Sequence, residues 1–529
     1  MSDTTFVYRQ TPISADWLNA VNRFVYDAPN QTDPLKGDAL IGVKKSWANS
    51  QGRTLHNVNN DTATIYDFLP SGFVTTNDAT TYIQAALDSG ASTVDFLGLA
   101  LKCDEVEIPT NVWAKDVNFT KFTNAAGNIV LFNSGCTVTG KIVGTSLTSA
   151  IQRCLYPAAD GVTDVYLNVE LANATYGLHA QYLTTDTVAN WPKRINGYVY
   201  AHDIVGTSGS SEGYGVLLSP AVSCQLKIDT KDIQRHALYL SAGARDCIID
   251  VTVDGCDNYA VQLFSNTSQS ATQFNTIRIK AKNLGESVAN QGGAVAIVQK
   301  AHYNTVSVDL EGNNATSWAV LIEGASGGPY PLGNKLIDSH ITGQFTGADV
   351  IRCINADSTH IKNNTLHCYA TNNVIALRRS GTNGITHGGY VEGNDINGQA
   401  QNVVGVYDEV NTVESYVGIN NIRNNGSSAR VTDSTSGYRT GYSRRATFSG
   451  TSGSVTATST LDVTPTINTS ISTTARRTQV WLTGSSVDYT KPSVILGQAP
   501  ASETQAAFRI YNAHSANQTF DYQGVVEGD

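Results

Sequence analysis

The feature that most constrains the fold of this chain is a five-residue pattern that recurs eight times with apolar residues at its second and fourth positions. Strict alternation of this kind predicts β-strands that pack one face into a core. Successive second positions are 22 residues apart at the closest, from Val216 to Leu238, and 34 at the widest, from Val261 to Val295. A βαβ unit of about 30 residues does not fit every interval, so the pattern predicts the coils of a parallel β-solenoid, an all-β fold. The eight segments are GVLLS (215–219), ALYLS (237–241), AVQLF (260–264), AVAIV (294–298), AVLIE (319–323), VIRCI (350–354), VIALR (374–378) and VVGVY (403–407).

A second series of apolar segments lies between members of the first and predicts a further strand in each coil. Asn275, Asn304 and Asn334 stand at the start of three of these segments. Because asparagine tolerates a left-handed backbone, we expect them at tight corners. The alternative, a β-sandwich, needs hairpin turns such as Asn-Gly at short intervals, and these are sparse. The series comprises CIIDVTVDG (247–255), NTIRIKAKN (275–283), NTVSVDLEGN (304–313), NKLIDSHITG (334–343) and HIKNNTLHC (360–368).

Composition and motifs exclude several classes of function. The formal net charge is −10 and the longest basic runs are pairs such as Lys44-Lys45, which argues against nucleic acid as a partner. The chain has no apolar run of about 18 residues and begins without a signal-peptide pattern, so we expect no membrane insertion and synthesis in a cytoplasm. Its eight cysteines lack metal-ligand spacing and are expected to be small buried hydrophobes. Because HExxH and P-loop patterns are also absent, we expect neither a metal nor a cofactor.

The N-terminal part predicts one short helix followed by a linker. Residues 14–27 (SADWLNAVNRFVYD) place apolar side chains at helical spacing, with Ser14 as the N-cap. A helix of about 14 residues is marginal on its own. We therefore expect its apolar face to dock on a partner or on other copies of the chain. The stretch that follows is rich in turn residues.

Residues 7–98 resemble the N-terminal anchor and first coil of bacteriophage tailspikes with a pectin-lyase-like fold. Asp67-Phe68, Asn77-Asp78 and YIQAALDSG match the family's opening strand and capping α-helix, whereas LPSGFVTT replaces its glycine-rich middle. The resemblance implies a right-handed parallel β-helix, a homotrimer, and attachment of the N-terminus to the phage tail, its baseplate or another tail protein. Related segments occur in lyases, hydrolases and non-enzymatic fibre proteins, so the resemblance specifies a fold and a context more than an activity.

Outward positions of the repeat form columns along such a helix. Equivalent residues of neighbouring coils lie about 4.8 Å apart, and with the second and fourth positions inward, the first, third and fifth face outward. Apolar side chains in the fifth column would be exposed, so we expect another protomer, a loop or a sugar to cover them. We predict a polysaccharide-binding groove along these columns. Its predicted binding residues are Phe264, Arg352, Arg378, Arg379 and Tyr407.

Glu323, in the fifth column, is the predicted acid of a glycoside hydrolase. Such enzymes hold two carboxyl groups about 5 Å apart when configuration is retained and about 6.5–9.5 Å apart when it is inverted. The predicted partners are Asp357, just beyond the next strand, and Asp408 or Glu409, three coils along and about 14 Å away by coil count. The competing interpretation of Glu323 is an exposed ion pair with an arginine of the columns, which would contribute little.

A polysaccharide lyase is the second enzymatic interpretation. It needs a cation to neutralise a uronate and a base to remove the neighbouring proton. The arginines of the columns and Tyr407 could supply these groups, as could Arg235, His236 and Tyr239 in KDIQRHALY. His236 precedes the inward Leu238 by two residues, so we expect it at the edge of the core as a hydrogen-bonded structural histidine.

The repeat ends near residue 442, and residues 446–529 alternate in short bursts that predict a small β-sandwich. By resemblance this module holds three chains together; it could instead bind glycans, although its aromatic residues suit core packing better. The predicted domains are an anchor and linker at 1–60, a β-helix at 61–442 and a C-terminal β-domain at 443–529. The predicted function is that of a phage tailspike in the virion tail that recognises and cleaves a bacterial capsule, O-antigen or exopolysaccharide. The alternative is a non-enzymatic receptor-binding fibre.

Overall fold

The computed structural model describes residues 62–145, 150–207, 212–285, 292–315, 318–325, 328–345, 349–379, 389–397 and 420–423. For residues 312–315, 378–379 and 422–423, and for short strands outside these ranges, it describes the backbone alone. The expected helix at 14–27 lies outside the described residues. The chain divides into two compact units, the first made of residues 1–239 and 244–251 and the second of residues 240–243 and 252–529.

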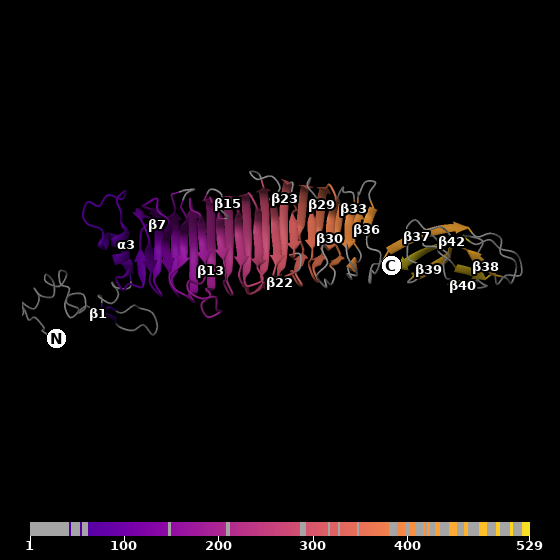
Figure 1. The fold of residues 1–529 in the computed structure, drawn as a ribbon, viewed down its shortest axis with the longest axis horizontal. Helices are drawn as coiled ribbons and strands as arrows, with labels where there is room; N and C mark the ends of the chain where they lie inside the picture. Colours follow the sequence, from indigo (N-terminus) through magenta and orange to yellow (C-terminus); the bar gives the residue numbers. More distant parts are fainter. Residues whose placement is uncertain are drawn as a thin grey trace, which may run out of the picture. The chain divides into compact units, whose positions relative to one another are not determined.

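A strand and a helix open the first unit, as the tailspike resemblance implies (Figure 1). Helix α3 buries one face through Ile83, Ala86 and Leu87. Its Gln84 donates from Nε2 to the carbonyl oxygen of Glu107 over 3.0 Å and accepts the backbone N–H of Glu107 over 2.8 Å. This helix thereby covers an exposed strand edge that would otherwise offer unpaired backbone groups. The elements are β3 (Thr62–Thr64), η4 (Ile65–Asp67), α3 (Thr80–Leu87), β4 (Thr93–Asp95), β5 (Ala100–Cys103) and β6 (Val106–Ile108).

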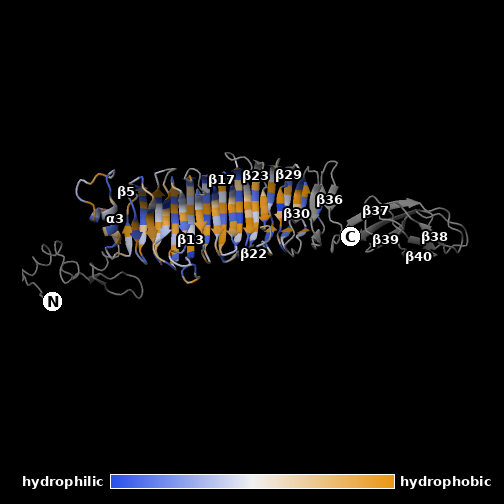
Figure 2. Cartoon of the chain, viewed as in Figure 1, coloured by the Kyte–Doolittle hydropathy of each residue, from blue (hydrophilic) through white to orange (hydrophobic). Residues whose placement is uncertain are grey.

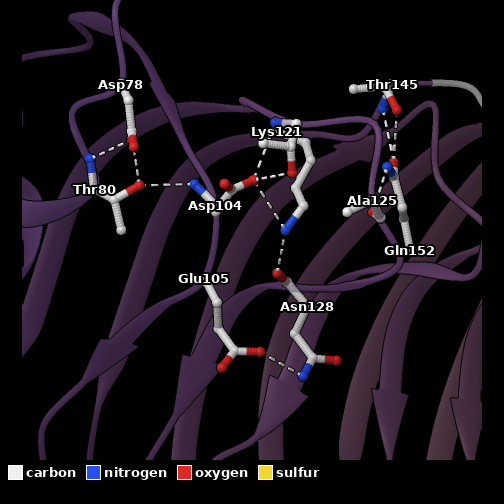
Figure 3. A network of polar contacts seen from close by, with 10 residues as sticks. Asp78, Thr80, Asp104, Glu105, Lys121, Ala125, Asn128, Thr145 and Gln152 are labelled. Carbon is white, nitrogen blue, oxygen red and sulfur yellow. Dashed lines mark hydrogen bonds and ion pairs between the residues drawn. The ribbon is translucent and has the colours of Figure 1, made fainter.

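A buried lysine joins the first coils of this unit (Figure 3). Only 5% of Lys121 is exposed. Its ammonium lies 3.4 Å from a carboxylate oxygen of Asp104 and donates to the carbonyl oxygen of Asn128 over 3.0 Å. The side chain of Asn128 in turn donates to Glu105 over 2.8 Å. Because its ammonium is paired with a carboxylate and donates a hydrogen bond, the lysine can be buried without the cost of an isolated ion.

Parallel strands build both walls of the first unit (Figure 1). One wall runs β6-β8-β10-β12-β14, with each neighbouring pair parallel. The other runs β4-β7-β9-β11-β13-β15, also parallel. Every connection returns the chain to the next strand in the same direction, which defines a parallel β-helix. The further strands are β7 (Trp113–Lys121), β8 (Gly127–Phe132), β9 (Thr137–Val143), β10 (Gln152–Pro157), β11 (Thr163–Ala172), β12 (Tyr176–Ala180), β13 (Lys193–Ile204), β14 (Tyr214–Leu218), β15 (Gln225–Ile233), β16 (His236–Ser241) and β17 (Ile248–Cys256).

The second unit continues the same architecture, a right-handed parallel β-helix. One wall runs β18-β21-β24-β27-β30-β33-β36 in parallel order. In its later coils the second predicted series divides into two short strands per coil, because left-handed Asp338 turns the chain between β25 and β26. The strands are β18 (Tyr259–Ser265), β19 (Thr272–Gln273), β20 (Thr276–Leu284), β21 (Gly293–Gln299), β22 (Ala301–His302), β23 (Thr305–Ala315), β24 (Val320–Glu323), β25 (Lys335–Ile337), β26 (His340–Phe345), β27 (Ile351–Ile354), β28 (His360–Lys362), β29 (Thr365–Ala370), β30 (Asn373–Arg379), β31 (Tyr390–Glu392), β32 (Asp395–Asn397), β33 (Asn402–Asp408), β34 (Tyr416–Val417), β35 (Asn421–Arg423) and β36 (Ala429–Asp433).

The predicted alternation is present, with one correction (Figure 2). The second and fourth positions are buried, as Val320 and Ile322 show with no exposed surface. The first position was expected to face outward, yet Ala319 is also fully buried. A Cβ added at Gly215, another first position, would lie 3.6 Å from the Cβ of Ala201 on the opposite wall. The first position therefore faces the core. Alternation is interrupted there, and the outward role passes to the residue before the segment, as in Tyr214 and Tyr259.

Buried asparagines link neighbouring coils of the second unit. Asn275 donates from Nδ2 to Oδ1 of Asn304 over 2.9 Å, and Asn304 donates in the same way to Asn334 over 3.1 Å. The expectation that these asparagines are left-handed is wrong. The residues with positive φ stand immediately before them, because a left-handed residue there turns the next side chain into the wall. Those residues are Phe274 (φ 58°), Tyr303 (φ 54°) and Gly333 (φ 63°).

Antiparallel strands follow the last coils. Among the described strands they form two three-stranded sheets, ordered β37-β42-β39 and β38-β41-β40. The pairing thus changes from parallel to antiparallel where the repeat was expected to end. All eight cysteines of the chain are buried, as predicted, and none is in a disulfide bond. The strands are β37 (Arg444–Thr451), β38 (Thr460–Val463), β39 (Arg476–Thr483), β40 (Val494–Gly497), β41 (Phe508–Tyr511) and β42 (Asp521–Gly528).

Candidate functional site

The fifth-position column predicted from the sequence exists as a single ladder in the second unit. Its members are direct register partners on adjacent strands, so each step is one strand spacing of about 4.8 Å. Glu323 and Arg378 lie two strands apart, as expected. The ladder runs through Phe264, Val298, Glu323, Ile354, Arg378 and Tyr407.

The predicted carboxylate partners of Glu323 do not share its ladder. Asp357 lies in the turn after β27, where it forms a bridge with Leu332 and accepts a hydrogen bond from Ser358 over 2.9 Å. The backbone of Asp408 ends β33, three strands from β24, which corresponds to about 14 Å. Its side chain and the whole of Glu409 lie outside the described residues. Glu323 therefore stands as the one described carboxylate on this ladder.

The predicted binding residues occupy adjacent ladders. Arg352 is the register partner of Leu321 and lies on the coil after Glu323. The competing ion pair between Glu323 and Arg352 does not form: within the described side chains, no Lys or Arg nitrogen lies within 4.0 Å of the Glu323 carboxylate. The backbones of Arg378 and Arg379 lie in β30 and that of Tyr407 lies in β33, and their side chains are outside the described set.

A further outward column, missed by the sequence analysis, consists of the residue that precedes each segment. In the second unit it includes Tyr259, Gly293 and Trp318. A Cβ at Gly293 would lie 2.6 Å from the Tyr259 ring and 2.2 Å from the carbonyl oxygen of Trp318. Glycine at this position leaves the space that the tyrosine ring occupies. The signal was visible in the sequence, since an aromatic residue or histidine stands directly before four of the eight segments.

In the second unit these columns form an apolar patch bordered by charge. Tyr259, Ala296 and Leu321 pack together, with Val298 and Trp318 against them. The Arg352 guanidinium lies 4.7 Å above the Trp318 ring. Its Nε and the indole N–H are buried without a hydrogen-bond partner among the described residues. Burial raises the pKa of Tyr259; the Glu323 carboxylate raises it further and Arg352 opposes this. A carboxylate, a phenol and a guanidinium therefore lie within electrostatic range around an aromatic floor.

The first unit carries a second aromatic patch on the outer face of β10, β12 and β14. Arg153 pairs in register with Tyr176, and Tyr176 with Tyr214. His236 stacks on Tyr214 with centroids 5.6 Å apart and planes inclined by 16°. Tyr239 lies 5.2 Å from Tyr214 and 5.5 Å from His236, so the three rings form one cluster. The structure thus brings together an arginine and four aromatic or histidine rings from the successive strands β10, β12, β14 and β16.

The Arg235, His236 and Tyr239 cluster considered for a lyase belongs to this patch. Arg235 lies 5.3 Å above the Tyr214 ring, and His236 is 1% exposed. Burial raises the pKa of Tyr214 and Tyr239. These phenols therefore keep their protons at neutral pH and can donate hydrogen bonds, which makes them poor general bases.

The described residues hold neither a candidate metal site nor a helix that could span a membrane. No group of three or more His, Cys, Asp or Glu side chains there is placed to hold a metal ion. In the same part of the chain, no helix is long and apolar enough to cross a membrane.

Comparison with solved structures returned phage tailspikes. The tailspike protein of E. coli bacteriophage HK620, in a double-mutant form, is 10% identical with a TM-score of 0.39, covering 97% of this chain and 100% of its own. The Gp54 tailspike of Acinetobacter baumannii bacteriophage AP22, solved in complex with A. baumannii capsular saccharide, is 10% identical with a TM-score of 0.39, covering 92% and 99%. The tailspike of Pseudomonas phage phi297 is 13% identical with a TM-score of 0.34, covering 83% and 66%. No family model matches the sequence, and no curated protein matches it.

Proposed function

We propose that this protein is a bacteriophage tailspike that binds a bacterial surface polysaccharide, such as capsule, O-antigen or exopolysaccharide, on the outer face of its β-helix. The observation that carries the proposal is the pair of aromatic patches, each bordered by an arginine that lies over a ring. Aromatic faces pack on the apolar faces of sugar rings, while guanidinium and phenol groups donate to sugar oxygens. The tailspike-like opening at residues 62–98 supports the assignment to a virion tail.

We further propose that the protein cleaves this polysaccharide, with hydrolysis favoured over elimination. Glu323 is the proposed acid: it is half-buried, it borders the Tyr259 patch, and no described cation pairs with it. It would protonate the glycosidic oxygen of the leaving sugar. A second carboxylate would either attack the anomeric carbon itself or deprotonate the water that attacks it. Asp408, Glu409 or a carboxylate of a neighbouring protomer is the proposed partner. The raised pKa values of Tyr214 and Tyr239 count against these two phenols as the base of a lyase.

A receptor-binding fibre without enzymatic activity is the second candidate. It is favoured by one observation: the ladder of Glu323 places no second carboxylate beside it among the described residues. In this case the same aromatic face would hold the glycan without cleaving it.

Three assembly proposals accompany this function. Residues 1–60 attach the protein to the tail, residues 61–442 bind the glycan, and residues 443–529 join the chains of a homotrimer. Their basis is the tailspike resemblance and the change from parallel to antiparallel pairing after β36.

The test is to incubate the purified full-length protein with envelope polysaccharides from candidate host bacteria. New reducing ends without the ultraviolet absorbance of unsaturated uronates would support a hydrolase. Both signals together would indicate a lyase and remove Glu323 as the acid. Binding with neither signal would support the receptor-binding fibre. Binding to no envelope polysaccharide would reject the proposed function.

A further inference from the structure

A chain of hydrogen bonds in the first unit fixes the orientation of Arg153. The Arg153 Nε–H donates to Nδ1 of His179 over 3.0 Å. Since Nδ1 accepts, the imidazole proton is on Nε2, which faces Oε1 of Gln181 at 2.9 Å. The Gln181 amide then donates to the hydroxyl oxygen of Tyr156 over 2.6 Å. Both nitrogens of the 95%-buried His179 are engaged, so the ring serves as a fixed acceptor for the arginine.

The same guanidinium rests on two aromatic rings. Its central carbon lies 5.2 Å from the ring centroid of Tyr156 and 5.4 Å from that of Tyr176. His179 stacks on Tyr176 with centroids 4.7 Å apart. Stacking and the Nε hydrogen bond together hold the planar group in one orientation, while its two terminal NH₂ groups form the fork that suits a carboxylate.

Among the described residues of this unit, Arg153 has no acidic partner, whereas four other cations have one. Lys115, Lys121, Lys141 and Arg194 each lie within 4.0 Å of a carboxylate. Among the described residues no Asp or Glu oxygen is that close to Arg153. The two undescribed segments nearest to Arg153 and Tyr214 in the sequence, 146–149 (SLTS) and 208–211 (SGSS), contain no acidic residue.

Glu212 is the acidic residue that acts electrostatically on Tyr176. Burial raises the pKa of Tyr176, the Glu212 charge raises it further and the Arg153 charge lowers it. The Glu212 carboxylate accepts a hydrogen bond from Thr207 over 2.8 Å. It therefore balances charge around the tyrosines without occupying the fork of Arg153.

We propose that Arg153, with Tyr156 and Tyr176, forms a subsite for an acidic sugar, whose carboxylate binds the two terminal NH₂ groups while its ring packs on the tyrosines. The proposal rests on the proposed function and deepens it, because it makes the glycan a polyanion such as a uronate-containing polysaccharide. His179 is a positioning residue that sets the angle of the fork. A preoriented guanidinium on an aromatic floor distinguishes a sugar carboxylate from a neutral sugar by a charge-assisted, two-point contact.

The direct test uses D-glucuronate and D-glucose as probes with the full-length protein, followed by saturation-transfer NMR. We expect transfer to glucuronate and little to glucose at equal concentration. Arg153→Met, which keeps the apolar stem over the tyrosines, should weaken glucuronate binding about tenfold or more. Arg194→Met is the matched control, because Arg194 is an exposed arginine of the opposite wall that pairs with Asp164. It should behave as the wild type.

His179 is tested by rescue. His179→Asn keeps an acceptor oxygen where Nδ1 stands and should retain more glucuronate binding than His179→Leu, which keeps none. Equal binding by the two variants, at equal thermal stability, would remove the positioning role.

Other outcomes would overturn the subsite. Glucuronate transfer that persists in Arg153→Met, or equal transfer to glucose, would reject it. Displacement of glucuronate by inorganic sulfate as strongly as by excess glucuronate would mean a general oxyanion site and reject the sugar. A protein that cleaves or binds an envelope polysaccharide without an Arg153-dependent glucuronate signal loses only this subsite, whereas the proposed function fails separately when no such polysaccharide binds.

Discussion

The role of Glu323 depends on whether a cation pairs with its carboxylate. A carboxylate at this ladder position could be half of an inert ion pair, but no described cation lies within 4.0 Å of it. We predict that Glu323→Gln preserves folding and binding while lowering hydrolysis by a factor of about 10²–10⁴, the usual contribution of a general acid. The measurement is the rate of reducing-end release on the polysaccharide that the wild type cleaves.

The matched control for this prediction is Glu392→Gln. Glu392 is a partly exposed glutamate of the same unit, but it forms an ion pair with Lys362. Its loss should leave turnover within about twofold, because exposed pairs contribute little. Unchanged turnover in Glu323→Gln would show that another group supplies the proton.

His179 gives the first unit an acid-sensitive residue. Burial and, next, the charge of Arg153 lower the pKa of His179 from its ordinary value of 6.5 to about 3. Between these values the unfolded chain binds a proton that the folded chain does not. The contribution of His179 to the free energy of unfolding should therefore be fully present above pH 6.5. It should fall as the pH drops towards 3, by up to about 1.4 kcal/mol per pH unit.

The measurement is the urea unfolding midpoint at pH 7 and pH 5 for the wild type and for His179→Asn. The variant should lose less stability over this interval than the wild type, by about 2 kcal/mol. His367→Asn, at an exposed histidine of the second unit, serves as the control and should follow the wild type. Equal acid sensitivity in the wild type and His179→Asn would contradict the assignment of the neutral ring.

At the scale of elements, the asparagine column is the device that holds consecutive coils in register. Fully buried Asn304 donates to Asn334 and to the carbonyl oxygen of Thr272 at 3.1 Å, and accepts from Asn275 at 2.9 Å. Asn304→Ala removes these bonds and leaves the buried groups without partners. We predict a loss of about 2–4 kcal/mol in unfolding free energy, measured by urea denaturation.

Asn283→Ala is the control for the column. Asn283 is exposed and donates a single hydrogen bond, to Asp254 over 2.7 Å. Its replacement should cost less than about 1 kcal/mol. A similar loss in both variants would mean that the column adds nothing beyond an ordinary surface contact.

The sequence predicted the elements that repeat and missed those that depend on bends. Alternation revealed the strands and the ladder of Glu323, because burial on one face leaves a period of two. It did not reveal that Ala319 faces the core or that Tyr259 takes the outward role, since both follow from an interruption of the alternation. Arg153 and His179 lie on neighbouring coils, and the coils of this chain differ in length. Counting residues along the sequence therefore could not place these two side chains in contact.

For the whole molecule, the charge balance bears on the kind of glycan that it can hold. The chain carries a formal charge of −10, so its net charge repels an acidic polysaccharide. Salt screens this repulsion beyond a Debye length of about 8 Å at physiological ionic strength. Recognition of such a glycan then depends on local, unpaired cations. Arg153, fixed by His179 and without a carboxylate partner among the described residues, is a group of this kind.

The proposed separation of tail attachment from glycan recognition also concerns the whole molecule. The described residues of both aromatic patches and the capping helix all follow residue 61. We predict that a chain lacking residues 1–60 keeps the unfolding midpoint and glycan activity of the full-length protein but no longer joins virions. The measurement is the amount of each protein in particles assembled by a phage that lacks its own copy. Phe24→Glu, on the apolar face of the expected helix, should reproduce the loss, and Asn22→Glu, outside that face, should not. Normal incorporation of the truncated chain would refute the anchor, as would lost glycan activity in a chain that still folds.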